Sequence, residues 1–408
     1  MISSSQLVLG GGLALGSVFW VELVRDLYHV LAHLWAPVGQ LHAWHHRVFR
    51  RDLTPVSEEI YRKAHWYNDV PEALVMLTFG LLFWGLLLSL SVPTAWLGLA
   101  GCLYTLSFLG AAIARGLGLP YAEELTDLTH RPGAFTELPG DWWVNRPYHW
   151  RHHFENQEAY YCGTFTLVDK LMGTALSIKG KRIAVTGASG TLGRALLTEL
   201  HQAGAKAIAL TSSSESLSIG IHQQDVPLPT VTWQIGAEAD LLDTLKKVDI
   251  LVLNHGINVH GDRTPEAIHK SYEINTFSQQ RLMALFLSTV ETNQDRVRKE
   301  IWVNTSEAEV SPAVSPLYEL SKRALGDLVT LQRLDAPIVI RKLILGPFKS
   351  ALNPVGVMSA NWVAKRIVGG ARRDFRNIIV TINPLTYVLF PIKEFFVASY
   401  FKLFSRGA

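Results

Sequence analysis

Three long apolar stretches lie within the first 113 residues, at 7–24, 73–92 and 96–113. A helix needs about 20 apolar residues to cross a bilayer, and inside lipid only helices and closed barrels satisfy every backbone polar group. We therefore expect three membrane-spanning helices, the last two forming a hairpin around Pro93. The first stretch has no basic leader and no small-residue cleavage site, so it is predicted to be a retained helix and not a signal peptide.

The charge pattern and the cysteine content indicate the orientation in the membrane, the class of partner and the redox compartment. The loop 47–63 carries Arg47, Arg50, Arg51, Arg62 and Lys63, so the positive-inside rule places it in the cytoplasm. The net charge of +3 is mild and not clustered, which excludes a nucleic-acid partner. Two cysteines cannot build a secreted disulfide framework, and a reducing compartment fits them.

The pattern changes after residue 176. Short β-type runs alternate with helical ones to about residue 350, which is typical of a parallel α/β sheet. We predict a membrane domain at 1–176, a linker at 177–181 and a doubly wound Rossmann domain at 182–375. The tail at 376–408 turns aromatic again and has interspersed lysines, which indicates an interfacial amphipathic helix or a helix packed on the soluble domain.

Ten of the fifteen histidines precede residue 155, and most of them fall in one HxxxH and two HxxHH repeats. Side chains at i, i+3 and i+4 share one face of a helix, so each repeat can aim two or three imidazoles at one point. Imidazole binds iron, zinc and copper, and one ion rarely takes more than about six ligands. The repeats therefore predict two metal ions held by His29, His33, His42, His45, His46, His149, His152 and His153.

These repeats, in this order and spacing, resemble the fatty acid hydroxylase and sterol desaturase superfamily over roughly residues 10–170. The resemblance implies two iron ions at the cytosolic membrane face, which zinc can replace in isolated protein. Such a centre uses dioxygen and an external electron donor to hydroxylate or desaturate a membrane lipid. It also implies His130 as a further ligand, with His65 weaker. Asp26, Asp127 and Asp169 are candidates to orient the ligand rings.

A glycine-rich turn opens the C-terminal domain. The run 182–193 (RIAVTGASGTLG) predicts a strand, a tight turn and the start of a helix. Glycines there let the backbone approach a pyrophosphate, which the helix N-terminus also attracts. Expected cofactor contacts are Thr186, Gly187, Ser189, Gly190, Leu192 and Gly193, joined by Thr211, Ser212, Asn254 and Gly256 after the next strands.

Four further residues follow in a recognisable order: Asn275, Ser306, Tyr318 and Lys322. Together with the glycine turn they resemble the short-chain dehydrogenase/reductase family over roughly residues 180–375. The resemblance implies that Tyr318 is the acid/base. Lys322 lowers the pKa of that tyrosine and binds the nicotinamide ribose. It implies that Ser306 binds the substrate oxygen and that Asn275 holds a relay water. His255 departs from the family, which usually has alanine there.

The tip of the strand at 207–210 is Thr211-Ser212-Ser213-Ser214, without an aspartate for a ribose 2′-hydroxyl. Hydroxyl groups tolerate a 2′-phosphate, so we expect NADP(H) in preference to NAD(H).

The chain as a whole resembles bifunctional sterol desaturase/short-chain dehydrogenase proteins, which implies a multi-pass membrane protein with both active sites on the cytosolic face. The leading hypothesis is hydroxylation or desaturation of a lipid followed by NAD(P)-dependent interconversion of alcohol and carbonyl. Two alternatives remain open: an N-terminal half that is only a scaffold, and decarbonylation of a fatty aldehyde, as similarity to plant wax-alkane-forming proteins suggests. Family resemblance also makes a homo-oligomer through the dehydrogenase half plausible.

Overall fold

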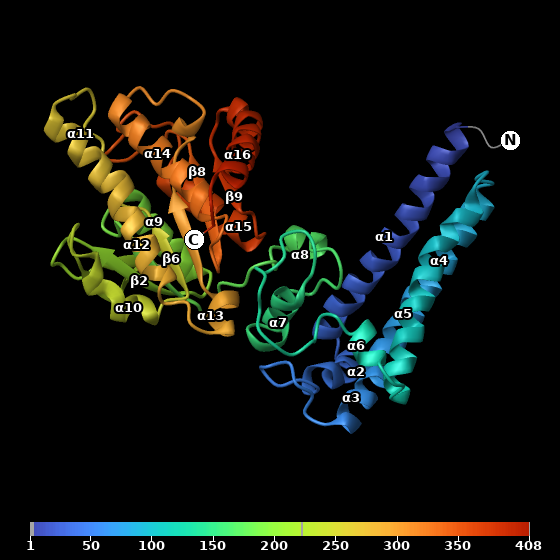
Figure 1. Cartoon of the computed structure of the whole chain (residues 1–408). Coiled ribbons are helices and arrows are strands. Elements are labelled where there is room, and N and C mark those ends of the chain that lie inside the picture. The colour runs from blue at the N-terminus through green and yellow to red at the C-terminus, as the bar shows by residue number, and fades with distance from the viewer. Residues whose placement is uncertain (1–3, 222, 408) are drawn as a thin grey trace. The chain divides into compact units, whose positions relative to one another are not determined.

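The computed structural model describes residues 4–221 and 223–407, and it divides into two compact units, Met1–Ala175 and Leu176–Ala408 (Figure 1). The described part of the N-terminal unit consists of helices and loops, whereas the C-terminal unit is an α/β domain. The division falls next to the linker predicted at 177–181.

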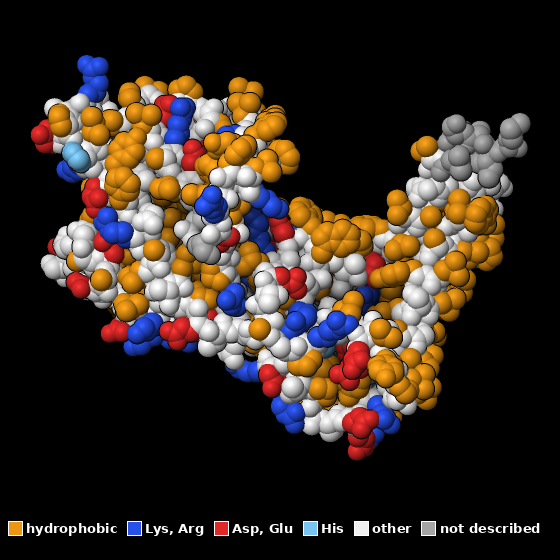
Figure 2. Space-filling view, viewed as in Figure 1, with side chains coloured by type: hydrophobic (Ala, Val, Ile, Leu, Met, Phe, Trp, Pro, Cys, Tyr) orange, Lys and Arg blue, Asp and Glu red, His pale blue; other side chains and the backbone are white. Residues whose placement is uncertain are grey.

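Three long helices form the apolar part of the N-terminal unit: α1 (Ser4–Leu34), α4 (Val70–Ser89) and α5 (Ala100–Leu117). They pack against one another, and apolar side chains cover much of the surface along them (Figure 2). Within the described residues, three helical segments are long and apolar enough to cross a membrane: Val8–Leu34, Glu58–Ser89 and Ala95–Leu117. These segments overlap the three stretches expected from the sequence, although the second ends at Ser89 and not at residue 92.

The first span is longer than the stretch predicted at 7–24, whose end was set by the charged residues Glu22 and Arg25, because α1 continues past both of them to Leu34. Arg25 Nε lies 2.7 Å from Glu72 Oε1 on α4, and Glu22 Oε1 accepts a 2.5 Å hydrogen bond from the hydroxyl of Tyr104 on α5. The helices also approach closely at Gly101, where an added Cβ would lie 2.4 Å from the carbonyl oxygen of Ser17. Polar pairing and small residues are the usual means of joining helices in a membrane.

Short elements gather at one end of the long helices (Figure 1). One of them, α7 (Arg146–Phe154), begins at Asn145, whose side chain accepts the N–H of Tyr148, and it has a proline in its first turn. The others at this end are α2 (Ala36–Arg47), α3 (Glu58–Ala64), π-helix η1 (His65–Asp69), α6 (Ala122–Thr126) and α8 (Leu167–Met172), whereas η2 (Ala95–Leu99) lies at the opposite end, between α4 and α5.

The C-terminal unit contains a seven-stranded parallel sheet in the order β5-β2-β1-β6-β7-β8-β9. Its strands are β1 (Arg182–Thr186), β2 (Lys206–Thr211), β5 (Thr230–Thr232), β6 (Ile250–Leu253), β7 (Glu300–Asn304), β8 (Val339–Leu345) and β9 (Asn377–Val380). A small hairpin, β3 (Ser218–Ile221) with β4 (Gln224–Pro227), stands apart from it. Strand order reverses between β1 and β6, which in doubly wound sheets is where ligands bind, beyond the carboxyl ends of the strands.

Helices cover both faces of this sheet, each over its own hydrophobic core. One core includes α9 (Thr191–Gln202) and α15 (Ala360–Arg372), and the other includes α10 (Leu242–Lys246), α12 (Ser278–Leu287) and α14 (Pro316–Gln332). The remaining elements are η3 (Glu238–Leu241), α11 (Pro265–Tyr272), π-helix η4 (Glu273–Phe277), α13 (Asn293–Arg298) and η5 (Glu307–Glu309). The predicted Rossmann fold is therefore present.

The sheet continues beyond residue 375, into the region predicted as a tail. Strand β9 pairs with β8 from Lys342↔Asn377 to Leu345↔Val380. Its two buried residues, Ile378 and Val380, belong to the first core. After it, the single helix α16 (Pro384–Phe404) packs on α14.

Candidate active site and candidate metal centre

The glycine turn after β1 has the shape that a dinucleotide needs. Gly187 adopts φ +60°, and a Cβ at Gly193 would lie 2.2 Å from the carbonyl oxygen of Gly187. Helix α9 begins at Gly190 without a side-chain cap, so the N–H groups of its first turn are available to a phosphate. The chain therefore fits a dinucleotide at this position.

The ends of β1 and β6 are joined by the hydroxyl of Thr186. This oxygen accepts the N–H of Asn254 at 2.8 Å and donates to the carbonyl of Val252 at 3.2 Å. It also lies 2.9 Å from Nδ1 of His255, the residue that departs from the family pattern. Burial lowers the pKa of His255 to about 3, so its ring is neutral and behaves as a packed polar side chain.

Ser306 follows β7, and Tyr318 lies in the first turns of α14. Their hydroxyls are hydrogen-bonded, which lowers the pKa of the Tyr318 phenol, while burial raises it more strongly. Lys322, one turn along α14, donates to the carbonyl of Asn304 at 2.7 Å. Burial lowers the pKa of Lys322 to about 8, despite the opposing charge of Glu309. The structure thus places Ser306, Tyr318 and Lys322 together.

Asn275 lies in the π-helix η4 and completes the group. Its Oδ1 accepts the N–H of Ile257 at 2.8 Å, and its Nδ2 donates to the carbonyl of Ile257 at 2.9 Å and to Ser321 Oγ at 3.0 Å. A Cβ on Gly256 would be 3.1 Å from Asn275 Oδ1 and 3.9 Å from Lys322 Nζ. Asn275 therefore fixes the loop after β6 against α14 at the catalytic edge.

The nine histidines predicted as ligands separate into two clusters in the N-terminal unit. Within each cluster, one ligand atom per residue lies within 4.8 Å of the others. The first cluster contains His29, His33, His42, His46 and His152, and the second contains His45, His130, His149 and His153. His65 is in neither cluster, and its Nδ1 lies 2.6 Å from Asp69 Oδ2.

Spacings between these nitrogens fit metal coordination. His153 Nε2 lies 3.0 Å from His45 Nε2, 3.1 Å from His149 Nε2 and 3.3 Å from His130 Nε2. One nitrogen carries at most one hydrogen, so hydrogen bonds do not account for all three contacts. Ligands about 2.0–2.1 Å from one ion lie roughly 2.9–3.4 Å apart, depending on geometry. In the first cluster, His152 Nε2 lies 3.0 Å from His29 Nε2 and 3.2 Å from His46 Nε2.

The opposite nitrogens of several rings are held by neighbours, as is usual for metal ligands. Nδ1 of His130 lies 2.6 Å from Asp127 Oδ1, as the sequence led us to expect for that carboxylate. Three contacts were not foreseen: His42 with Asn68 Oδ1, His29 with the carbonyl of Tyr161, and His152 with the carbonyl of Ala159. Burial holds the pKa of His45, His149 and His153 well below the usual range, which keeps these rings neutral, the form that binds metals.

Asp26 and Asp169 do not orient ligand rings. Asp26 Oδ1 accepts the N–H of Gly163 at 2.9 Å. Asp169 accepts the N–H groups of Tyr161 and Cys162 at 3.0 and 2.8 Å, and so shapes the loop whose carbonyls meet the histidines.

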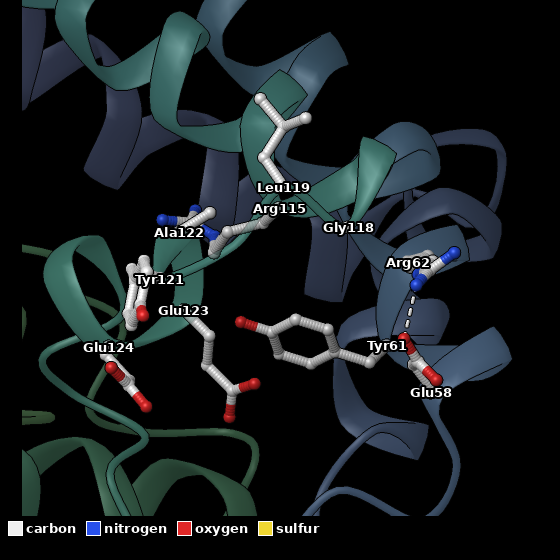
Figure 3. A pocket seen from close by; sticks show the side chains of 10 residues that line it. All are labelled: Glu58, Tyr61, Arg62, Arg115, Gly118, Leu119, Tyr121, Ala122, Glu123 and Glu124. Atoms are coloured by element: carbon white, nitrogen blue, oxygen red, sulfur yellow. Dashed lines mark hydrogen bonds and ion pairs between the residues drawn. The ribbon is translucent and has the colours of Figure 1, made fainter.

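Two cavities lie near the second cluster. One, of about 320 Å³, is lined by His45, His130 and His149 together with Arg25 and Glu72. The other, of about 170 Å³, has the carboxylates of Glu58, Glu123 and Glu124 in its lining (Figure 3). Tyr61 lines this second cavity and donates a 3.2 Å hydrogen bond to Asp127, so it connects the cavity to His130.

Comparison with known proteins follows these two sites. The chain is 64% identical over 403 residues to the monoglucosyldiacylglycerol epimerase of Synechocystis sp., and the match covers 98% of each chain. The short chain dehydrogenase family model matches residues 181–341, which include Asn275, Ser306, Tyr318 and Lys322. The chain is also 29% identical over 179 residues to dehydrogenase/reductase SDR family member 7B of Mus musculus, covering 39% of this chain and 54% of that protein.

Solved structures resemble the C-terminal unit. A short chain dehydrogenase from Burkholderia cenocepacia in complex with NADP has a TM-score of 0.45 at 17% identity, covering 57% of this chain and all of that one (100%). The aldohexose dehydrogenase of Thermoplasma acidophilum has a TM-score of 0.40 at 14% identity, covering 50% of this chain and 93% of its own.

The lowered pKa of Lys322 predicts a pH effect on stability. The folded state binds the Lys322 proton only below about pH 8, whereas the unfolded chain binds it up to its ordinary pKa of about 10.4. Unfolding therefore takes up a proton between these values, and stability attributable to Lys322 rises with pH across that window.

We expect the thermal unfolding midpoint of the native chain to rise relative to that of Lys322→Met as the pH is raised from 7 to 10.5. Parallel curves for the two proteins across this range would contradict the shifted pKa. Lys247→Met, which removes an exposed lysine, is the control.

Proposed function

Because the chain belongs to the family of the monoglucosyldiacylglycerol epimerase of Synechocystis sp., we propose that it epimerises a hydroxyl-bearing carbon in the glucosyl headgroup of a diacylglycerol lipid. The observation that carries this proposal is the identity of 64% across 98% of both chains. The grouping of Ser306, Tyr318 and Lys322 beside the dinucleotide turn supports an oxidation–reduction route.

Bound NAD(P) supplies a hydride acceptor in the first step and a hydride donor in the second. Tyr318 removes the proton of the sugar hydroxyl as the adjacent C–H bond breaks, and the carbon becomes a ketone. Ser306 donates a hydrogen bond to the ketone oxygen. The cationic form of Lys322 favours the Tyr318 phenolate in the first step. Tyr318 then returns its proton to the oxygen when a hydride is added to the opposite face. The sum is redox-neutral, and only the configuration at one carbon has changed.

The opposite-face requirement restricts the binding of the sugar. The catalytic groups stay at the carboxyl edge of β6 and β7, so the flat ketone has to turn over between the two steps. Contacts that hold the lipid portion while the sugar rotates meet this need better than a closed sugar pocket does.

A second candidate function concerns the N-terminal unit, and the two histidine clusters favour it. We propose that this unit holds two transition-metal ions, with His29, His33, His42, His46 and His152 around one and His45, His130, His149 and His153 around the other. Such ions, if iron, supply dioxygen chemistry of the kind used for lipid hydroxylation or desaturation. Epimerisation consumes neither dioxygen nor electrons, so hydroxylation would be a separate activity that also needs an external electron donor.

The epimerase proposal predicts that Tyr318→Phe abolishes turnover. Purified full-length protein, glucosyl diacylglycerol in detergent micelles and NAD(P) are incubated, and the hexoses released from the lipid are separated. We expect the rate to fall by roughly 10²–10⁴-fold, because the proton acceptor is lost. Tyr272→Phe, on α11, is the matched control. Full activity of Tyr318→Phe would remove this residue from the mechanism.

The metal proposal predicts two ions per chain in detergent-purified protein, measured by elemental analysis. His152→Ala and His153→Ala should each lose about one ion, because they belong to different clusters. His269→Ala, an exposed histidine on α11, should keep both. Equal metal content in all four proteins would contradict the assignment.

Epimerase and hydroxylated-lipid assays on these histidine variants then separate the roles of the N-terminal unit. Loss of an oxygenated lipid alone supports two activities. If neither product changes in a metal-depleted variant, the N-terminal half is a scaffold.

For the cofactor, we expect tighter binding of NADP than of NAD. Thr211 Oγ1 donates a 3.3 Å hydrogen bond to Ser189, and Arg194 Nε donates to the Ser189 carbonyl at 3.2 Å, so a cation that the sequence analysis overlooked lies beside the hydroxyl-rich tip. Ser212→Asp should reverse the preference by repelling a 2′-phosphate. Fluorescence titration with both dinucleotides measures this, with Ser288→Asp, an exposed position at the end of α12, as control. Tighter binding of NAD by the native chain would overturn the expectation.

A further inference from the structure

Helix α16 exposes apolar side chains on its outer face, which is the reverse of a helix on the surface of a water-soluble domain. Apart from Lys402, every exposed side chain of this fully described helix is apolar or aromatic. Phe396 is 65% exposed and Leu403 is 76% exposed. Apolar side chains gather over the α16 region in the space-filling view (Figure 2). Surface helices in water normally turn such residues inward.

The inner face of α16 instead carries its charges. Glu394 is buried and lies 2.7 Å from Lys342 Nζ of β8 and 3.1 Å from Nη1 of Arg333, which follows α14. Lys393 lies 2.6 Å from Asp327 and 2.9 Å from Glu309. Buried ion pairs need good geometry to persist, so this network fixes which side of the helix faces outward. The outer side is therefore presented to an apolar medium.

The start of α16 is attached to the catalytic edge. Thr381 donates a 2.6 Å hydrogen bond to Glu307, the residue after Ser306. Asn383, the N-cap of the helix, donates to Ser311 Oγ at 3.2 Å. The apolar outer face thus begins beside the loop that carries Ser306.

Two loops at the same edge also expose valines. Val314, at 99% exposure, precedes α14, and Val355, at 87%, lies between β8 and α15. Asn258 connects these loops, since it accepts from Ser315 Oγ at 2.7 Å and donates to the carbonyl of Leu352 at 3.3 Å. Exposed apolar side chains therefore lie on two loops at the catalytic edge as well as on α16.

We infer that the outer face of α16 (Phe395, Phe396, Tyr400, Leu403 and Phe404), together with Val314 and Val355, docks the C-terminal unit on the surface of a lipid bilayer. Interfacial helices bury an apolar face about 5–10 Å into the boundary between headgroups and acyl chains. Within the described residues 384–407, the exposed charges are Lys402 and Arg406, which complement anionic lipids. A two-fold pairing of copies through α16 would bring these cations together without an exposed carboxylate on the described helix to offset them.

Docking has a consequence for catalysis that rests on the proposed function. The sugar of a glycolipid would reach Tyr318 while its acyl chains stay in the bilayer. The C-terminal unit then needs no cavity for the acyl chains, and the sugar remains free to turn over between the two hydride transfers.

The test uses full-length protein labelled at Phe396→Cys with an environment-sensitive fluorophore. It is reconstituted into vesicles of phosphatidylglycerol and phosphatidylcholine, with or without bromine on the acyl chains. We expect a blue-shifted emission that brominated chains quench at least twofold. Lys247→Cys, an exposed position just before β6, should show neither effect. Cys102 and Cys162 are buried, and the unsubstituted protein measures their background.

Equal quenching at positions 396 and 247 would overturn docking, as would cross-linking between the 396 positions of two chains without quenching. A catalytic measurement then connects docking to turnover. Phe396→Glu/Leu403→Glu should reduce turnover of glucosyl diacylglycerol in vesicles at least tenfold and leave that of a detergent-soluble short-chain analogue unchanged. Quenching without any epimerase activity in the native chain would refute the proposed function and leave docking intact.

Discussion

The catalytic edge depends on the hydrogen bonds that the Thr186 hydroxyl makes between β1 and β6. Parallel strands at a reversal of strand order diverge and leave a crevice beyond their carboxyl ends. Thr186 closes the base of that crevice, because its oxygen holds both the backbone of Asn254 and the ring of His255. The glycine turn and the loop after β6 thereby stay in close contact, since a Cβ on Gly187 would lie 2.9 Å from the Cα of His255. Asn275 fixes that loop to the catalytic helix.

The proposed lipid substrate adds a constraint that such an edge does not meet alone. Each buried CH₂ contributes about 0.8 kcal/mol to holding a lipid in the bilayer, so a soluble active site has to come to the membrane. Two features of the chain meet this requirement. Its N-terminal unit contains three helices long and apolar enough to span a bilayer. Helix α16 of the C-terminal unit exposes aromatic side chains. A chain that joins a helical unit to a dehydrogenase unit is therefore consistent with the proposed activity on a glycolipid. This holds with or without a second activity at the histidine clusters.

Much of both sites could be predicted from the sequence, because the relevant residues are close in the chain or follow successive strands. The HxxxH and HxxHH repeats specify imidazoles on shared helix faces, and Tyr318 and Lys322 are one turn apart. What could not be foreseen depends on contacts between distant segments. The carbonyls of Tyr161 and Ala159 that hold His29 and His152 have no side-chain signature. Glu22 and Arg25 indicated a helix end because their partners, Tyr104 and Glu72, are on other helices. Strand β9 (Asn377–Val380) lies beyond residue 350, where the alternation of strand and helix patterns ended, and so it was not predicted. The sequence also did not indicate the proposed epimerisation. Tyr318 and Lys322 can serve reversible oxidation of an alcohol whether the hydride returns to the same face of the carbon or to the opposite face.

The most direct test of the account is the fate of the hydride. A glucosyl diacylglycerol carrying deuterium on each hydroxyl-bearing ring carbon is converted by the full-length protein in the presence of NAD(P)⁺ and a smaller amount of unlabelled NAD(P)H, and the product sugar is analysed by mass spectrometry. If the hydride removed beside Tyr318 is returned from the same bound cofactor, the epimerised sugar keeps all of its deuterium and no reduced cofactor accumulates. Loss of one deuterium from each product molecule, or accumulation of a keto sugar, would contradict a redox-neutral epimerisation at this site.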